Sequence, residues 1–311
     1  MKKAFKDESA SDFDLNRLLV AMLRENGHEA YPVLISTRAH GVVNPYLPMK
    51  KHFNFLIVKL NIGDETYLLD ASEKDNVFGV LPQYCLNGKG LVIYQGPEMW
   101  VDLEPYSKNG TMVQAKMKLE LDGSLNGDLS LTYTGYEARN FNGEKNKSST
   151  PQDLYNSKEN WDLNSYEYSD KGPLQCEEKL NLSINAAAEE LGEMIYFKPI
   201  LSREEFENPF KSITRIYPVQ FVAPFTNRYV GIIEVPDSLE IVSVPESARI
   251  SLPNNSGSMQ YSINAAGNLL IVNQIFQISN TQFLAEDYDA LREFYTLVVG
   301  KIAEPIVLKR K

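Results

Sequence analysis

The stretch from Ser9 to Asp70 constrains the fold of this chain most, because its pattern predicts one helix followed by strands. Ser11 is a good helix cap, and apolar residues recur at helical spacing over residues 15–23, as in a buried amphipathic helix. Three strand-like runs follow, at residues 30–37, 53–60 and 66–69, and the last leads directly into Asp70. This order predicts a helix packed on an antiparallel sheet.

Three segments of this stretch carry a resemblance to a known family: residues 16–38 (NRLLVAMLRENGHEAYPVLISTR), 53–57 (FNFLI) and 67–72 (YLLDAS). They resemble segments of bacterial transglutaminase-like proteins, a branch of the papain-like cysteine-nucleophile enzymes. The first is similar to the family's nucleophile helix, and the other two resemble the strands that carry its histidine and its aspartate. The resemblance covers residues 10–102, and a weaker similarity to the family's C-terminal β-sandwich of unknown function continues to the end of the chain.

This resemblance places Asp12 at the position of the nucleophilic cysteine, Phe55 at that of the histidine and Asp70 at that of the aspartate. A cysteine nucleophile works as a thiolate beside an imidazole that takes its proton. A carboxylate at a helix start is a weak nucleophile, and a phenyl ring carries no proton. We therefore predict a pseudoenzyme with no catalytic residue, in which Asp12, Phe55 and Asp70 are a vestigial triad.

A shifted triad of Ser11, His52 and Asp70 is the alternative for this stretch. Side chains alternate along a strand, so a His52 on the same strand as Phe55 points to the opposite face. Ser11 with Asp14 three residues later is close to a capping box, which satisfies the N–H groups of a helix start. We favour the helix cap over the nucleophile.

The remaining sequence predicts a second, all-antiparallel domain. Residues 104–110 (EPYSKNG) form a linker, which divides the chain into a degenerate transglutaminase-like domain at 1–106 and a β-sandwich domain at 107–311. Alternating runs at 112–121 and 125–133 flank Asp122-Gly123, a strong hairpin signal. Later strands are predicted at residues 174–184, 194–197, 213–219, 229–235, 240–244, 248–252, 259–264 and 269–278, followed by a helix at 285–300 and a last strand at 305–309.

A polar insertion is expected at residues 135–172, with a short helix from Thr150 to about residue 160. Its aromatic residues allow two interpretations. Trp161, Tyr166 and Tyr168 are either a sugar-binding platform or anchors that hold a long loop on the sandwich. We favour the anchors, because large aromatic side chains supply the burial that fixes a loop.

Charge and apolar content exclude several classes of partner. The net charge of −10 disfavours nucleic acid and anionic membrane surfaces, and no apolar run reaches the length of about 20 residues that a membrane span requires. The first six residues, MKKAFK, lack the apolar core of a signal peptide. Because the chain opens almost directly on the nucleophile helix, we expect a truncated or fragmentary first domain that a partner could cover. The resemblance implies a periplasmic or cell-surface location.

Cysteine and histidine residues indicate neither a metal site nor a cofactor. Cys85 and Cys176 are the only cysteines and fall in different domains, so buried apolar roles are expected. The three histidines, at positions 28, 40 and 52, lack the spacing of zinc ligands.

The sequence leaves three functions open. The first is a non-catalytic interaction or structural module of a bacterial cell envelope, with an unknown protein, peptide or glycan as partner. The second is a carbohydrate- or peptide-binding module that uses the vestigial cleft, since a papain-like cleft is concave even without its nucleophile. The third is an active cysteine protease or transglutaminase, which would require Cys85 to meet a histidine in space.

Overall fold

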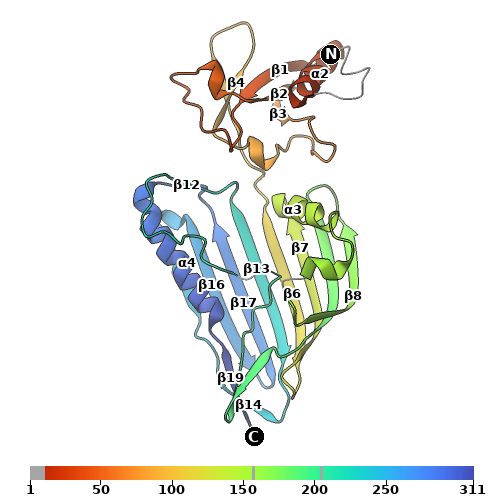
Figure 1. The fold of residues 1–311 in the computed structure, drawn as a ribbon, viewed down its shortest axis with the longest axis vertical. Helices are drawn as coiled ribbons and strands as arrows, with labels where there is room; N and C mark the ends of the chain where they lie inside the picture. Colours follow the sequence, from red (N-terminus) through yellow and green to blue (C-terminus); the bar gives the residue numbers. More distant parts are fainter. Residues whose placement is uncertain (1–10, 156–157, 204–205) are drawn as a thin grey trace. The chain divides into compact units, whose positions relative to one another are not determined.

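The chain is of the α+β class, with few helices and mostly antiparallel sheets (Figure 1). The computed structural model describes residues 11–155, 158–203 and 206–311. It divides into two compact units, Met1–Tyr106 and Ser107–Lys311. The division falls within the linker at 104–110.

The first unit is a five-stranded antiparallel sheet with one α-helix, and its strand order is β3-β2-β1-β4-β5. Two single-turn helices, η1 (Lys50–His52) and η2 (Gln83–Cys85), lie in its connections. Its other elements are α2 (Asp12–Glu25), β1 (Glu29–Ile35), β2 (Phe55–Ile62), β3 (Glu65–Leu69), β4 (Lys89–Val92) and β5 (Met99–Asp102).

Ser11 is the N-cap of helix α2, as predicted. The Ser11 side chain accepts a hydrogen bond from the backbone N–H of Asp14 at 3.2 Å, which satisfies a donor of the first turn. The buried face differs from the predicted stripe, because Met22 is 56% exposed. Asn16 and Val20 face inward instead, and Val20 joins a small core with β2 residues such as Val58.

The second unit is built on an eight-stranded sheet of order β15-β16-β17-β13-β6-β7-β9-β8. All neighbouring strands in it are antiparallel except β13 and β6, which are parallel. The strands are β6 (Gly110–Leu119), β7 (Leu125–Thr134), β8 (Trp161–Asp170), β9 (Gln175–Ile184), β13 (Phe225–Glu234), β15 (Ala248–Ser251), β16 (Gly257–Ala266) and β17 (Leu269–Ile278).

This sheet has one buried and one exposed face, as the alternating pattern predicts. The predicted hairpin at Asp122-Gly123 joins β6 to β7, with Leu119 opposite Leu125. Along β6, Met117 and Leu119 are buried, while Lys116 and Lys118 on the other face are exposed.

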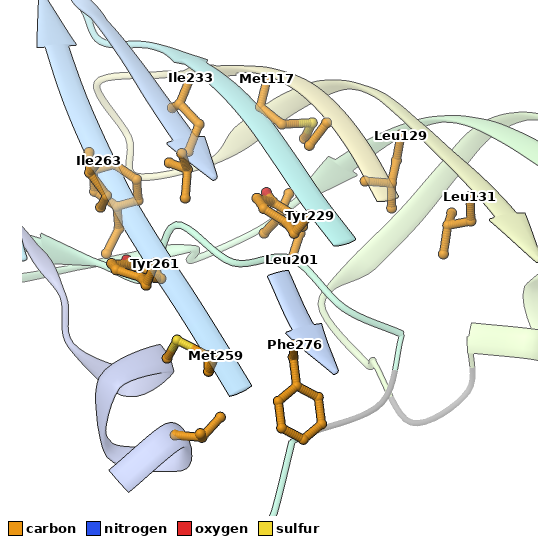
Figure 2. Packing of buried hydrophobic residues seen from close by; sticks show 14 of the residues in the cluster. Met117, Leu129, Leu131, Leu201, Tyr229, Ile233, Met259, Tyr261, Ile263 and Phe276 are labelled. Atoms are coloured by element: carbon orange, nitrogen blue, oxygen red, sulfur yellow. The ribbon is translucent and has the colours of Figure 1, made fainter. Parts of the chain in front are cut away.

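The buried face shares a single core with a second, four-stranded sheet and with the last helix. The small sheet has the order β10-β11-β19-β14, and α4 contacts β17 through rings such as Phe276 and Phe294, whose centroids are 6.0 Å apart. Figure 2 shows part of this core, with Met117 of β6, Tyr229 of β13 and Met259 of β16. The added elements are β10 (Ala188–Leu191), β11 (Met194–Phe197), β14 (Leu239–Ser243), α4 (Tyr288–Ala303) and β19 (Ile306–Arg310).

The region 135–172 is not a separate polar insertion, because it supplies the outer strand β8 to the sheet and buried residues such as Phe141 to the core. Its last element, β8, pairs along its length with β9, and helix α3 (Tyr136–Lys145) precedes it. The helix predicted from Thr150 is only the 3-10 turn η3 (Pro151–Tyr155); residues 156 and 157 lie outside the described residues. The predicted strand at 213–219 is also wrong, because only Val219–Gln220 pairs, as β12, with β18 (Gln282–Phe283). Ile213 and Ile216 before it are exposed, so the apolar residues there do not indicate a buried strand.

Candidate functional site

Asp70, which the sequence predicts as one position of a vestigial triad, lies directly after β3 and is 9% exposed. Its Oδ1 accepts hydrogen bonds from the Asn16 side chain at 2.7 Å and from the backbone N–H of Ser72 at 3.0 Å. Its Oδ2 accepts from the Ser72 hydroxyl at 2.8 Å, the Tyr84 hydroxyl at 2.9 Å and the Asn76 side chain at 3.0 Å. Because a carboxylate offers about four lone-pair positions, five donors leave no place for an imidazole N–H.

Asn16 connects this carboxylate to helix α2. The side chain is fully buried, and besides Asp70 it bonds the backbone carbonyl of Asp12 at 3.2 Å. Its own oxygen accepts from the backbone N–H of Ala71 at 2.8 Å. The result is a cross-link between the first turn of the helix and the residues that follow β3.

Asp12 and Phe55 both lie next to this network without bonding the Asp70 carboxylate. Asp12 is exposed in the first turn of α2 and meets the network only through its backbone carbonyl. The Phe55 ring packs edge-on against the Tyr84 ring, with centroids 5.5 Å apart. Tyr84 thus lies between Phe55 and Asp70, and burial raises the pKa of its hydroxyl, helped by the Asp70 charge.

The shifted triad is not assembled in the structure. The Ser11 hydroxyl lies 3.1 Å from the Asp14 carboxylate, where it caps the helix. His52 is in the turn η1, and β2 begins only at Phe55, so the prediction that His52 alternates with Phe55 on one strand is wrong. The backbone N–H of His52 donates a hydrogen bond to the Met49 carbonyl at 2.8 Å, which closes this turn before β2 pairs with β1.

Cys85 is the cysteine of the first unit, and it is fully buried in η2. Burial raises the pKa of its thiol strongly, and the nearby charges of Asp70 and Glu73 raise it further. A thiol held in its protonated form is a poor nucleophile. In the described part of the chain no group of His, Cys, Asp and Glu side chains is arranged to hold a metal ion.

The aromatic residues of β8 face the core of the second unit. Trp161 is 5% exposed and stacks on Tyr155, with centroids 5.8 Å apart. A bulge between Leu163 and Ser165 shifts the alternation by one residue, so Tyr166 and Tyr168 point to the same face as Trp161. Tyr168 is held by Asn142 at 2.9 Å. This burial favours the anchor interpretation over a sugar-binding platform.

A second buried carboxylate, Glu178 of β9, was not predicted from the sequence. It is fully buried and accepts hydrogen bonds from the hydroxyls of Tyr133 and Tyr155 at 2.6 and 2.7 Å. Burial raises its pKa above the usual range, against the opposing effect of these hydroxyls and of Arg203. A polar residue at an inward position of an otherwise apolar alternating run is the signal that could have identified it.

One family model matches the C-terminal part of this chain. A family model of a domain of unknown function, DUF3858, for which a solved structure exists, matches residues 193–308. These residues run from β11 into β19. The comparison with curated proteins gave no match.

One solved structure resembles the whole chain. It comes from Parabacteroides distasonis ATCC 8503, is described as a "putative protease", and aligns with a TM-score of 0.51 at 11% sequence identity. The alignment covers 99% of this chain and 45% of that protein, so this chain spans less than half of its length. A likeness at this identity concerns the fold alone.

Proposed function

We propose that the chain is a non-catalytic, transglutaminase-like protein that serves as an interaction or structural module of a bacterial cell envelope. The observation that carries this proposal is the set of five hydrogen bonds on Asp70. They come from amide and hydroxyl groups, and they occupy the carboxylate that would otherwise orient an imidazole. Asp70 then links helix α2 to the sheet through its hydrogen bond with Asn16.

The surroundings of Asp70 support the same proposal. The residues at the other two triad positions are an exposed carboxylate, Asp12, and a phenyl ring, Phe55, and neither supplies a nucleophile or a base. The buried Cys85 thiol, with its raised pKa, is no substitute. The second unit fits a sandwich-like domain, because its small and large sheets contribute to one core. The envelope location rests on the resemblance, and the structural neighbour is also bacterial.

Covalent labelling of the native full chain tests the loss of chemistry. We expect neither a fluorophosphonate, which modifies activated serines, nor iodoacetamide at stoichiometric amounts to label the folded protein. The same iodoacetamide treatment in denaturant labels Cys85 and Cys176, which is the matched positive control. Rapid labelling of native Ser11 or Cys85 at one defined site would overturn the proposal and favour the active-enzyme alternative that the neighbour's description suggests.

The interaction role has its own support in an exposed apolar segment between β1 and β2. Val42, Tyr46 and Leu47 are 66%, 96% and 62% exposed, an exposure that is unusual for three large apolar residues in one segment. Glycan and peptide arrays would compare the wild type with Phe55→Ala and with a Tyr46→Ser, Leu47→Ser double variant. Loss of retention only in the double variant supports this segment, whereas loss only in Phe55→Ala supports a ligand at the vestigial triad.

A further inference from the structure

The connection between β1 and β2 lies in a stretch of sequence without acidic residues. No Asp or Glu occurs from Ala30 to Gly63, although the chain contains 41 of them and has a net charge of −10. The connection also contains Lys50 and Lys51, which are adjacent in the turn η1 and are both exposed. Among the described residues, neither lysine makes an ion pair. This part of the first unit is therefore locally cationic in an acidic chain.

Residues 42–49 of this connection form a tip loop that exposes several large apolar side chains. Tyr46 is 96% exposed, and Val42, Leu47 and Met49 are exposed as well. Single exposed apolar residues are ordinary on protein surfaces. Several in one short segment indicate a contact with another apolar surface or phase.

The base of the tip loop is held by the rest of the first unit. The Gly41 carbonyl accepts hydrogen bonds from the Ser36 hydroxyl at 2.6 Å and from the Asn87 side chain at 2.8 Å. Val43 is buried and anchors the loop from within. Because the loop is already ordered, a contact through its exposed side chains costs little conformational entropy.

The N–H groups at the end of the tip loop have partners within the loop. Pro45 and Pro48 have no N–H group. The backbone N–H of Tyr46 donates to Asn44 Oδ1 at 2.9 Å, and that of Leu47 donates to the Asn44 carbonyl at 3.1 Å. An unpaired N–H is costly in a medium that contains no water. The end of the loop can therefore enter an apolar phase without leaving one of these donors unpaired.

We propose that the tip loop docks the protein on an anionic lipid bilayer, with Tyr46 and Leu47 in the interfacial region and Lys50 and Lys51 at the headgroups. This inference rests on the proposed interaction role and names its partner. Tyrosine suits a membrane interface because its ring is apolar and its hydroxyl is polar, and lysines are attracted to anionic lipids. The internal pairing of the loop's N–H groups favours a bilayer over a protein partner, which would offer hydrogen-bond acceptors of its own.

Screening by salt reconciles this contact with the acidic composition of the chain. At physiological ionic strength, charges more than about 8 Å from a surface contribute little to its potential. The lipid headgroups would therefore respond to the lysines next to the tip loop, and the net charge of −10 would have little effect.

A second exposed apolar segment, residues 213–217 of the other unit, provides a comparison. Its neighbouring cations are engaged within the protein. Lys211 pairs with Glu207 at 2.9 Å, and Arg215 donates from Nε to the Tyr217 carbonyl at 3.0 Å. This segment therefore has exposed apolar side chains without the uncommitted lysines of the tip loop.

Flotation of the full chain with lipid vesicles tests the proposal. We expect the wild type to float with vesicles made of equal parts of phosphatidylcholine and phosphatidylglycerol. Binding to vesicles of phosphatidylcholine alone should be about tenfold weaker or more, because the attraction of the two lysines to anionic headgroups is then lost. Added salt should weaken binding to the mixed vesicles, because it screens that attraction.

Two double variants separate the apolar and the charged parts of the contact. Tyr46→Ser, Leu47→Ser removes buried apolar area and should weaken binding to the mixed vesicles about tenfold or more. Lys50→Glu, Lys51→Glu should weaken that binding by a similar factor and should leave binding to phosphatidylcholine alone unchanged.

Two matched controls make the same kinds of change elsewhere. Ile216→Ser, Tyr217→Ser alters residues that are 81% and 71% exposed in the second segment. Lys116→Glu, Lys118→Glu makes the same charge change on the exposed face of β6. Both controls should bind like the wild type, and an unchanged unfolding temperature shows that each variant is folded.

Four results would overturn the proposal. They are no flotation of the wild type with the mixed vesicles, equal binding to both kinds of vesicle, binding that survives both tip-loop variants, and equal losses in the controls. If a peptide or glycan is retained on the arrays while vesicles are not bound, the bilayer is rejected and the proposed interaction role remains. The covalent labelling test is independent of all these results.

Discussion

Each unit contains a buried carboxylate, and the two are stabilised in different ways. Asp70 follows a strand and is surrounded by loop and helix residues that provide five hydrogen bonds to it. Glu178 lies within β9, where the neighbouring strands restrict what can reach it, and two tyrosine hydroxyls bond one of its oxygens. A buried carboxylate at the end of a strand can receive all its hydrogen bonds from the surrounding loop and helix residues. A buried carboxylate within a strand depends instead on long side chains that reach it from other elements.

Replacing Asp70 by Ala should have the largest effect. It removes the acceptor of the buried Asn16 amide and of the Ser72 and Tyr84 hydroxyls, of which the two hydroxyls, 3.0 Å apart, can still bond each other; each donor left unsatisfied costs about 1–3 kcal/mol. Because these groups are not all fully buried, we expect the first unit to lose about 3–4 kcal/mol. The two tryptophans fall one in each unit, so in a Trp161→Phe background the fluorescence of Trp100 reports urea unfolding of the first unit.

The comparison between the two carboxylates would be wrong if Asp70→Ala changed the unfolding free energy of the first unit by less than about 0.5 kcal/mol, the range of ordinary surface substitutions. In that case Asp70 would not be fastening the helix to the sheet. Trp161 in a Trp100→Phe background is the matched control, since unfolding of the second unit should not change.

Glu178→Gln should have a smaller, pH-dependent effect on the second unit. The folded-state pKa of Glu178 is raised, so the folded protein keeps its proton in a pH range where the unfolded chain has already lost it. The contribution of Glu178 to wild-type stability is therefore fully present below about pH 4.3, the unfolded-state pKa, and is lost as pH rises through the folded-state pKa. The glutamine does not titrate and still offers an oxygen to Tyr133 and Tyr155.

Urea unfolding followed by Trp161 between pH 4 and pH 8 measures this difference. The unfolding free energy of the Glu178→Gln variant should increase relative to that of the wild type as pH rises. This increase should be complete above the folded-state pKa of Glu178. Parallel stability curves would mean that Glu178 titrates normally and that burial does not disturb it.

Asp12→Ala should have the smallest effect. Asp12 is exposed, and its side chain acts only through its charge in the first turn of α2, which is worth about 0.3–1 kcal/mol. A much smaller loss of unfolding free energy for Asp12→Ala than for Asp70→Ala would support a structural role for Asp70 alone. Equal losses for Asp12→Ala and Asp70→Ala in unfolding free energy would show that both carboxylates belong to one coupled structural unit.

The fold was largely predictable because its strands alternate regularly. The β6–β7 hairpin and the last helix follow from periodicity and turn residues alone. Strand β8 was missed because it is a polar outer strand whose bulge near Asn164 interrupts the alternation. Helix α3 was missed because its sequence, YEARNFNGEK, is rich in asparagine and has a glycine, both weak helix formers.

The candidate site was predictable only at the positions that the resemblance supplied. Asp70 was identified, but its partners Asn16 and Tyr84 are 54 and 14 residues away and are brought together only by tertiary packing. The sequence does contain one signal for Asn16, because it is a polar residue on the helix face that also carries Val20. The partners of Glu178, Tyr133 and Tyr155, come from other elements and meet it through tertiary contacts that no local pattern records.

A double-mutant cycle between Asn16 and Asp70 tests the central claim most directly. Unfolding free energies of the first unit would be measured by Trp100 fluorescence for the parent, Asn16→Ala, Asp70→Ala and the double variant, all in the Trp161→Phe background. If Asp70 now fastens the helix to the sheet, the coupling energy should be about 1.5–3 kcal/mol, as for a hydrogen bond to a charged group. Losses that add to within about 0.3 kcal/mol would contradict the account.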